Sequence, residues 1–112
     1  MGNTWRAKEQ EFAILTNEIT NPWSGLSTRQ YKQVKGLKKE GLRDNMTNLE
    51  LALNMLAEAT TTEISREKQP EGLEQNRVIA KQGGTIAGKT RKEIEEKTGK
   101  PVVSTANAKQ LN

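Results

Sequence analysis

The residues of this chain whose types and spacing could support chemistry begin with segment 83–90, which reads GGTIAGKT. It matches the GxxxxGK[ST] pattern of a phosphate-binding loop, in which backbone amides wrap the phosphates while a lysine and a hydroxyl reach the terminal phosphate and magnesium. Such a loop follows a buried strand, but only three apolar residues, 78–80, precede it. Ala80, Ala87 and Ile94 keep a seven-residue spacing through the glycines. A helix therefore explains the segment better than a nucleotide site.

Carboxylates are the second group with chemical potential. Glu93, Glu95 and Glu96 could provide acid-base catalysis or bind a hard metal ion, but three cations interleave with them between positions 91 and 97. Charge runs of this kind usually form a solvated helix face. The chain has no cysteine and no histidine, which removes thiol nucleophiles, imidazole bases and the usual nitrogen and sulfur metal ligands. We expect a non-enzymatic protein with no catalytic residue, no cofactor and no metal site.

A basic stretch between Arg29 and Asp44 is the third feature. It holds six cations and two acids, and the rest of the chain is balanced, so the net charge of +4 is concentrated there. Such a stretch is typical of a surface that meets a polyanion or an acidic partner. An exposed Tyr31 could stack on a base there, although the tyrosine is alternatively a core residue and the lysines the solvated side of a helix. We predict a nucleic-acid or partner-binding site formed by Arg29, Tyr31, Lys32, Lys35, Lys38, Lys39 and Arg43.

Two helices are predicted to position the basic stretch. Apolar residues recur on one helical face between about residues 5 and 19, and Pro22 with the asparagine before it is expected to end that helix. Ser27 and Gln30 form the pattern of a capping box, which begins a second, short helix. We expect this helix to end at Gly41.

The second half of the chain predicts a helical hairpin. A capping box at Thr47 and Glu50 begins a helix that runs to about Lys68, and Pro70 follows as a break. One long helix, or two joined near the glycines at 83 and 84, then continues to Gly99. Small residues in this part would let a neighbouring helix approach closely. The expected core face of the first arm contains Leu49, Leu53, Leu56, Ala57 and Ile64.

Length and composition indicate one domain over residues 1–112, with a flexible tail from about 102 to 112. We predict an all-α fold of about four helices with a long helical hairpin. Hydrophobic residues make up only 32% of the chain, so the core should be thin, and a homodimer is an open alternative for completing it. No apolar run is long enough to cross a bilayer and no signal peptide is recognisable, so we expect a cytoplasmic protein without membrane contact.

The sequence also resembles the carboxy-terminal half of the DNA-damage-inducible protein D family over most of its length. The most specific part is the Lys-Gly-Leu-Lys-Lys run, with the Asp-x-Met and Glu-Leu steps that follow it. The matching residues are Phe12-Ala13-Ile14, Gly25-Leu26, Tyr31-Lys32, Lys35-Gly36-Leu37-Lys38-Lys39, Asp44-Asn45-Met46, Glu50-Leu51, Ala59-Thr60-Thr61-Thr62-Glu63, Gly88, Arg91 and Ile94.

The resemblance implies a role in the SOS response, where the family is associated with restraint of the RecA recombinase on single-stranded DNA. In that family an amino-terminal BRO-type domain, shared with phage antirepressors, precedes this half. This chain begins shortly before the shared region, so we expect that domain to be missing. The first hypothesis is a regulatory domain that binds DNA or a RecA filament. The alternative is a phage or mobile-element antirepressor or defence-modulating module that binds protein, and a phosphate-loop nucleotide-binding protein is the weakest reading.

Overall fold

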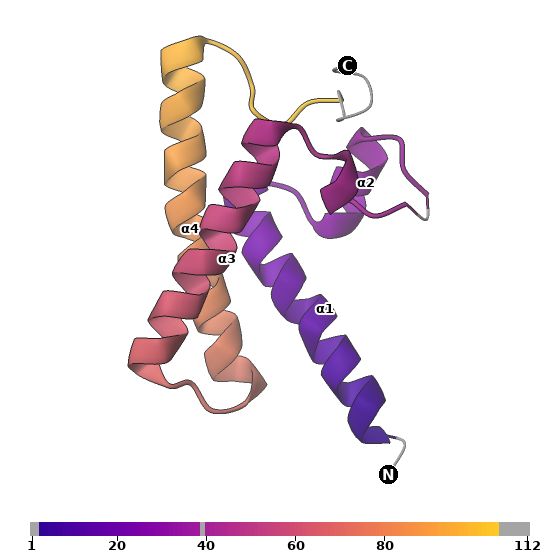
Figure 1. The fold of residues 1–112 in the computed structure, drawn as a ribbon, viewed down its shortest axis with the longest axis vertical. Coiled ribbons are helices and arrows are strands. Elements are labelled where there is room, and N and C mark those ends of the chain that lie inside the picture. The colour runs from indigo at the N-terminus through magenta and orange to yellow at the C-terminus, as the bar shows by residue number, and fades with distance from the viewer. Residues whose placement is uncertain (1–2, 39, 106–112) are drawn as a thin grey trace.

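The structure is a computed structural model and describes residues 3–38 and 40–105. This part of the chain contains no strand, and its elements follow the order α1 (Asn3–Ser24), α2 (Thr28–Val34), the 3-10 helix η1 (Arg43–Asn45), α3 (Asn48–Lys68) and α4 (Gly72–Thr98). Helices α3 and α4 form an antiparallel hairpin, and α1 packs against both (Figure 1). The predicted all-α fold with a long helical hairpin is confirmed. None of the described helices combines the length and apolarity needed to cross a membrane.

Local side-chain chemistry begins α2 and α3 where the sequence predicts. The hydroxyl of Ser27 accepts a hydrogen bond from the backbone N–H of Gln30 at 3.1 Å, and the side-chain oxygen of Gln30 accepts one from the backbone N–H of Ser27 at 3.0 Å. Thr47 and Glu50 form the same reciprocal pair at the start of α3. These bonds satisfy amides that the first helical turn leaves without partners, which explains why both predicted starts are confirmed.

Helix α1 continues through Pro22 to Ser24, so the prediction that it ends at the Asn-Pro pair is wrong. Proline removes one hydrogen bond inside a helix, but other groups hold this last turn. The hydroxyl of Ser24 donates to the carbonyl of Thr20 at 2.6 Å, and the backbone N–H of Gly25 donates to the carbonyl of Asn21 at 2.8 Å. The final turn therefore persists despite the missing amide.

Helix α2 ends at Val34 and not at Gly41, because Gly36 adopts a left-handed conformation with φ 72°. The N–H of Gly36 donates to the carbonyl of Gln33 at 3.1 Å, and the N–H of Leu37 donates to the carbonyl of Lys32 at 2.9 Å. This pair of bonds is the Schellman motif, which closes a helix at a glycine. The early end changes where every later residue of the basic stretch lies.

Helix α4 is continuous, and its small residues lie where it meets its two neighbours. Gly83 faces α3, since a Cβ atom there would lie 2.9 Å from the carbonyl oxygen of Ala57. Gly88 faces α1, since a Cβ atom there would lie 2.5 Å from the carbonyl oxygen of Pro22, and Gly84 meets the α1 backbone in the same way. Segment 83–90 is thus a helix-packing surface, as its seven-residue spacing predicts.

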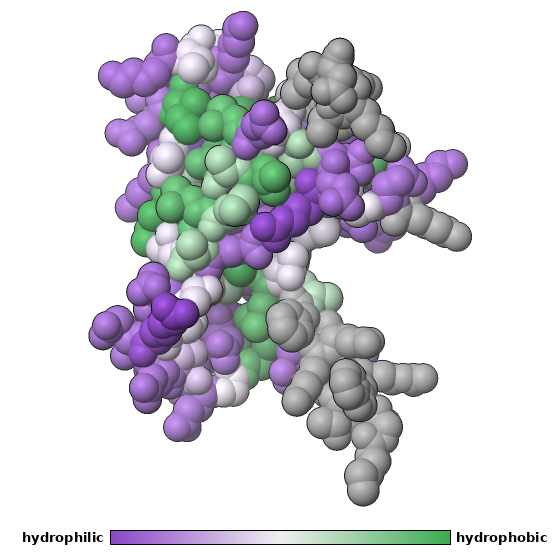
Figure 2. Space-filling view, viewed as in Figure 1, coloured by the Kyte–Doolittle hydropathy of each residue, from purple (hydrophilic) through white to green (hydrophobic). Residues whose placement is uncertain are grey.

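The core is thin and leaves one apolar face uncovered. Trp23, Tyr31 and Ala57 are fully buried and Leu53 is nearly so, whereas Leu56 remains 37% exposed. The prediction that the whole expected face of α3 is buried is therefore wrong in part. Figure 2 shows hydrophobic side chains gathered on the surface of α3 beside α4. The large exposed side chains on these two helices are those of Leu49, Met55, Leu56, Val78 and Ile86.

The segment after α4 is anchored at its start. Val102 is buried in the core, and its backbone N–H donates to Glu95 Oε2 at 2.9 Å. Val103 packs against the same core. The prediction of a flexible tail from residue 102 is therefore wrong for these two residues, because their side chains complete the core, and positions 106–112 lie outside the described residues.

Truncation of two leucines of α3 tests this packing. We expect Leu53→Ala to lower the free energy of unfolding by about 2 to 5 kcal/mol, because it opens a cavity in the core. Leu56→Ala should cost about 1 kcal/mol or less, because this side chain already contacts solvent. Urea denaturation measures both, and equal losses would show that the two side chains are buried alike.

A second test concerns the close contact between α4 and α1. Helix propensity alone predicts that Gly88→Ala stabilises the protein by about 1 kcal/mol. The short distance to the α1 backbone predicts instead a loss of about 1 to 3 kcal/mol. Thr85→Ala, at an exposed position of the same helix, is the control and should raise the melting temperature slightly, as helix propensity alone predicts. A stabilised Gly88→Ala protein would contradict the packing of α4 on α1.

Candidate partner-binding interface

The structure separates the seven predicted binding residues into three groups. Arg29, Lys32, Lys38 and Arg43 reach the surface around α2 and η1, with Lys32 half-buried. We call these four side chains the basic surface. Tyr31 and Lys35 are buried. Lys39 lies outside the described residues.

A buried carboxylate holds Tyr31 and Lys35. Lys35 Nζ lies 2.6 Å from Glu50 Oε1, and the side chains of both residues are 0% exposed. The hydroxyl of Tyr31 donates to Glu50 Oε2, and the backbone N–H of Thr47 donates to Glu50 Oε1 at 3.0 Å. The prediction that Lys35 and Tyr31 meet a ligand is wrong for the folded chain. The reason is that α2 ends before Lys35, which places this lysine at the helix cap above Glu50.

The environment of Tyr31 keeps its hydroxyl protonated. Burial is the largest cause that raises its pKa above the usual value, and the hydrogen bond to Glu50 and the negative charge of that carboxylate raise it further. The phenol is therefore a fixed hydrogen-bond donor in the neutral pH range, and it contributes to structure rather than to contact with a partner.

Trp23 links the same region to α3. Its ring centre lies 5.9 Å from that of Tyr31 in a tilted arrangement, and its Nε1 donates to Asn54 Oδ1 at 3.2 Å. Both rings are fully buried. The alternative that Tyr31 is a core residue is therefore confirmed, and neither ring is exposed to stack on a nucleic-acid base.

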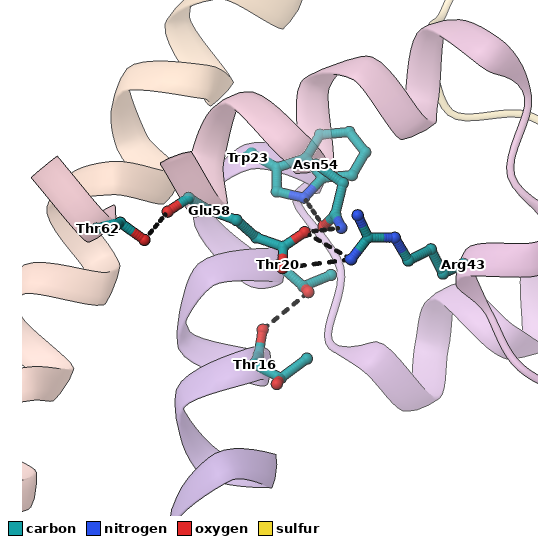
Figure 3. A network of polar contacts seen from close by, with 7 residues as sticks. All are labelled: Thr16, Thr20, Trp23, Arg43, Asn54, Glu58 and Thr62. Atoms are coloured by element: carbon teal, nitrogen blue, oxygen red, sulfur yellow. Dashed lines mark hydrogen bonds and ion pairs between the residues drawn. The ribbon is translucent and has the colours of Figure 1, made fainter. Parts of the chain in front are cut away.

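Arg43 extends from η1 to the polar side of α3 (Figure 3). Its guanidinium group lies 2.9 Å from Glu58 Oε1, and Asn54 Nδ2 donates to the same oxygen at 3.0 Å. The side chains of Arg43 and Glu58 are 54% and 43% exposed. Exposed ion pairs contribute little stability, so this arginine can exchange its partner at small cost.

A pocket of about 210 Å³ opens beside this arginine, between α1, α2, η1 and α3. We call it the Arg43 pocket. Its apolar wall contains Ile19, Leu42 and Met46, and its polar side contains the Arg43–Glu58 pair. Sequence reasoning missed it, since the lining residues come from four elements and share no spacing along the chain.

The acidic run of α4 has a structural role. Glu95 pairs with Arg91 at 2.8 Å, and Arg91 Nε donates to the backbone carbonyl of Trp23 at 2.6 Å, at the end of α1. The described residues contain no group of acids arranged to hold a metal ion. The basic surface and the Arg43 pocket are therefore the features of this region of the described chain that are suited to a partner.

No family model, curated protein or solved structure matches the chain. Its function must therefore be inferred from the charges, burial and cavities of this interface.

The raised pKa of Tyr31 predicts how stability depends on pH. Tyr31→Phe should cost about 1 to 3 kcal/mol at pH 7, because Glu50 loses a donor. Above pH of about 10 the unfolded tyrosine ionises while the folded one stays protonated, so the folded state is favoured less as pH rises. The difference between parent and variant should then shrink by about 1.4 kcal/mol per pH unit.

Tyr31 is the single tyrosine of the chain, so tyrosinate absorbance reports on it directly. Denaturation curves between pH 7 and 11 measure the stability difference, and absorbance should rise only as the protein unfolds. Ionisation of the folded protein near the usual pKa would contradict the buried hydrogen bond to Glu50.

Proposed function

We propose that this protein is a non-enzymatic regulatory binding protein of the DNA-damage-response type. It engages DNA, or a DNA-bound protein such as the RecA filament, through the basic surface. One observation supports this most strongly: Arg29, Lys32 and Lys38 lie around one short helix, and within the described chain none has an acidic side chain at ion-pair distance. Clustered cations of this kind attract phosphates and acidic surfaces. The cytoplasm is the expected location, and no cofactor is required.

The buried residues beneath the basic surface favour this proposal. Lys35 and Tyr31 hold α2 against Glu50, so α2 is fixed on the hairpin before any partner arrives. A surface that is already ordered loses less conformational freedom on binding than a mobile loop does. Tyr31, Lys35 and Glu50 all belong to the residues that carry the family resemblance. They would keep α2 in place while the exposed cations contact the partner.

A phage or mobile-element antirepressor or defence-modulating module is the second candidate. The Arg43 pocket favours it, because an apolar wall beside an arginine suits a protein better than a phosphate backbone. A nucleotide-binding protein has the least support, since Gly83, Gly84 and Gly88 are buried against neighbouring helices within α4. The homodimer remains a prediction, and the exposed apolar side chains of α3 and α4 offer it a surface.

Replacement of three surface cations tests the proposal. We expect the triple variant Arg29→Gln, Lys32→Gln and Lys38→Gln to fold and to bind single-stranded DNA or RecA filaments more weakly. If all three reach phosphates, the slope of log affinity against log salt should fall by roughly 2 to 3 units, at about 0.7 per contact on single strands and 0.9 on duplex. Fluorescence anisotropy across a salt series measures this.

The matched control removes three exposed cations of α4 by Lys89→Gln, Lys92→Gln and Lys97→Gln. This variant has the same net charge as the first one but keeps the basic surface, and its binding should stay close to that of the parent. Equal losses in both variants would indicate attraction to total charge alone. Unchanged binding in the first variant would remove the support for the proposed site.

A further inference from the structure

The Arg43 pocket has the size and walls of a site for one apolar side chain. Its volume of about 210 Å³ exceeds the roughly 150 Å³ of a dry apolar cavity that holds a benzene ring. Ile19, Leu42 and Met46 supply aliphatic and thioether walls, and a methionine adapts its shape to different occupants. A leucine, methionine or phenylalanine side chain fits this volume.

Thr28 adds a polar group that has no use within the fold. Its backbone N–H donates to Asn17 Oδ1 at 2.9 Å, so the amide is satisfied. Thr28 lines the pocket, and its hydroxyl is buried at the pocket wall with no hydrogen-bond partner among the described residues. A buried hydroxyl without a partner is unfavourable, and a bound backbone could supply the missing bond.

A second hollow lies beside the first along α1. It shares Thr16, Ile19 and Glu58 with the Arg43 pocket and extends to Leu15 and Ala80, towards α4. The ribbon of α1 diverges from α3 in this direction (Figure 1). An elongated ligand with an anchor residue suits two neighbouring hollows better than a compact molecule does.

We propose that the Arg43 pocket seats one apolar anchor side chain of an acidic segment of a protein partner. Arg43 and Glu58 both line the pocket as an exposed ion pair, so an acidic residue beside the anchor can replace Glu58 as the partner of Arg43. The occupant is a protein side chain rather than a nucleic-acid base, because among the side chains that the structure describes no aromatic ring lines the pocket to stack on a base. This inference rests on the proposed function only in that the partner approaches through the basic surface.

Blocked tripeptides test the anchor directly. The probes are acetyl-Asp-Leu-Asp-amide, the same peptide with a central alanine, and acetyl-Lys-Leu-Lys-amide, each titrated into methyl-labelled protein and followed by NMR. The leucine peptide should shift the methyl signals of Met46, Ile19 and Leu42 and should bind roughly tenfold more tightly than the alanine peptide, since more apolar surface is buried. The lysine-flanked peptide should bind more weakly than the acidic one.

Two substitutions locate the site. Thr16→Phe introduces a ring at the pocket lining from a position whose side chain is exposed, and it should abolish most of the leucine preference. Thr62→Phe, on an exposed position of α3 outside that lining, is the control and should bind as the parent does. Thr28→Val, which replaces the hydroxyl by a methyl group of similar size, should fold and bind the leucine peptide several-fold more weakly.

Equal affinity for the leucine and alanine peptides, or shifts away from the three methyl groups, would overturn the anchor site. An oligothymidine that shifts those methyl groups and loses binding in Thr16→Phe, while the peptides show no preference, would assign the pocket to a base and also overturn it. The peptide experiments test the anchor site separately from the proposed function. If the triple glutamine variant bound DNA and RecA filaments as the parent does, that result would refute the proposed function and leave the anchor site unaffected.

Discussion

A single buried carboxylate, that of Glu50, links the short helix α2 to the helical hairpin of this protein. Glu50 lies at the first turn of α3 and accepts hydrogen bonds from the phenol of Tyr31, the ammonium group of Lys35 and the backbone of Thr47. Desolvating a carboxylate costs several kcal/mol, and only a full set of donors offsets this cost. The position of α2, and with it that of Arg29 and Lys32, therefore depends on the donors that Tyr31 and Lys35 supply.

The exposed and buried cations of the basic stretch have different roles for this reason. Lys35 stabilises the buried negative charge of Glu50. Arg29, Lys32 and Lys38 instead reach the surface around α2, the helix that Lys35 anchors. Arg43 combines both roles, since it forms an exposed ion pair with Glu58 and also lines the Arg43 pocket. A positive stretch in a sequence can thus contain both buried structural cations and exposed ones, and only the fold shows which of them a partner can reach.

Features encoded within a few residues could be predicted from the sequence. The two capping boxes, the hairpin around Pro70 and the helical state of segment 83–90 each depend on neighbours in the chain. The burial of Lys35 could not be predicted, because it requires both the turn at Gly36 and a carboxylate fifteen residues later. The Arg43 pocket was equally hidden, since it exists only after four elements meet.

The glycines of α4 also decide which arrangement of the three long helices the chain can adopt. The backbone of α4 lies against the backbone of α1 at Gly84 and Gly88, and against Thr61 and the carbonyl of Ala57 in α3 at Gly83. A slide of α4 by one residue would place Thr85 or Lys89 where a glycine now fits. In other registers a side chain would clash with the backbone of α1. A helix with few large apolar residues therefore still packs in one way.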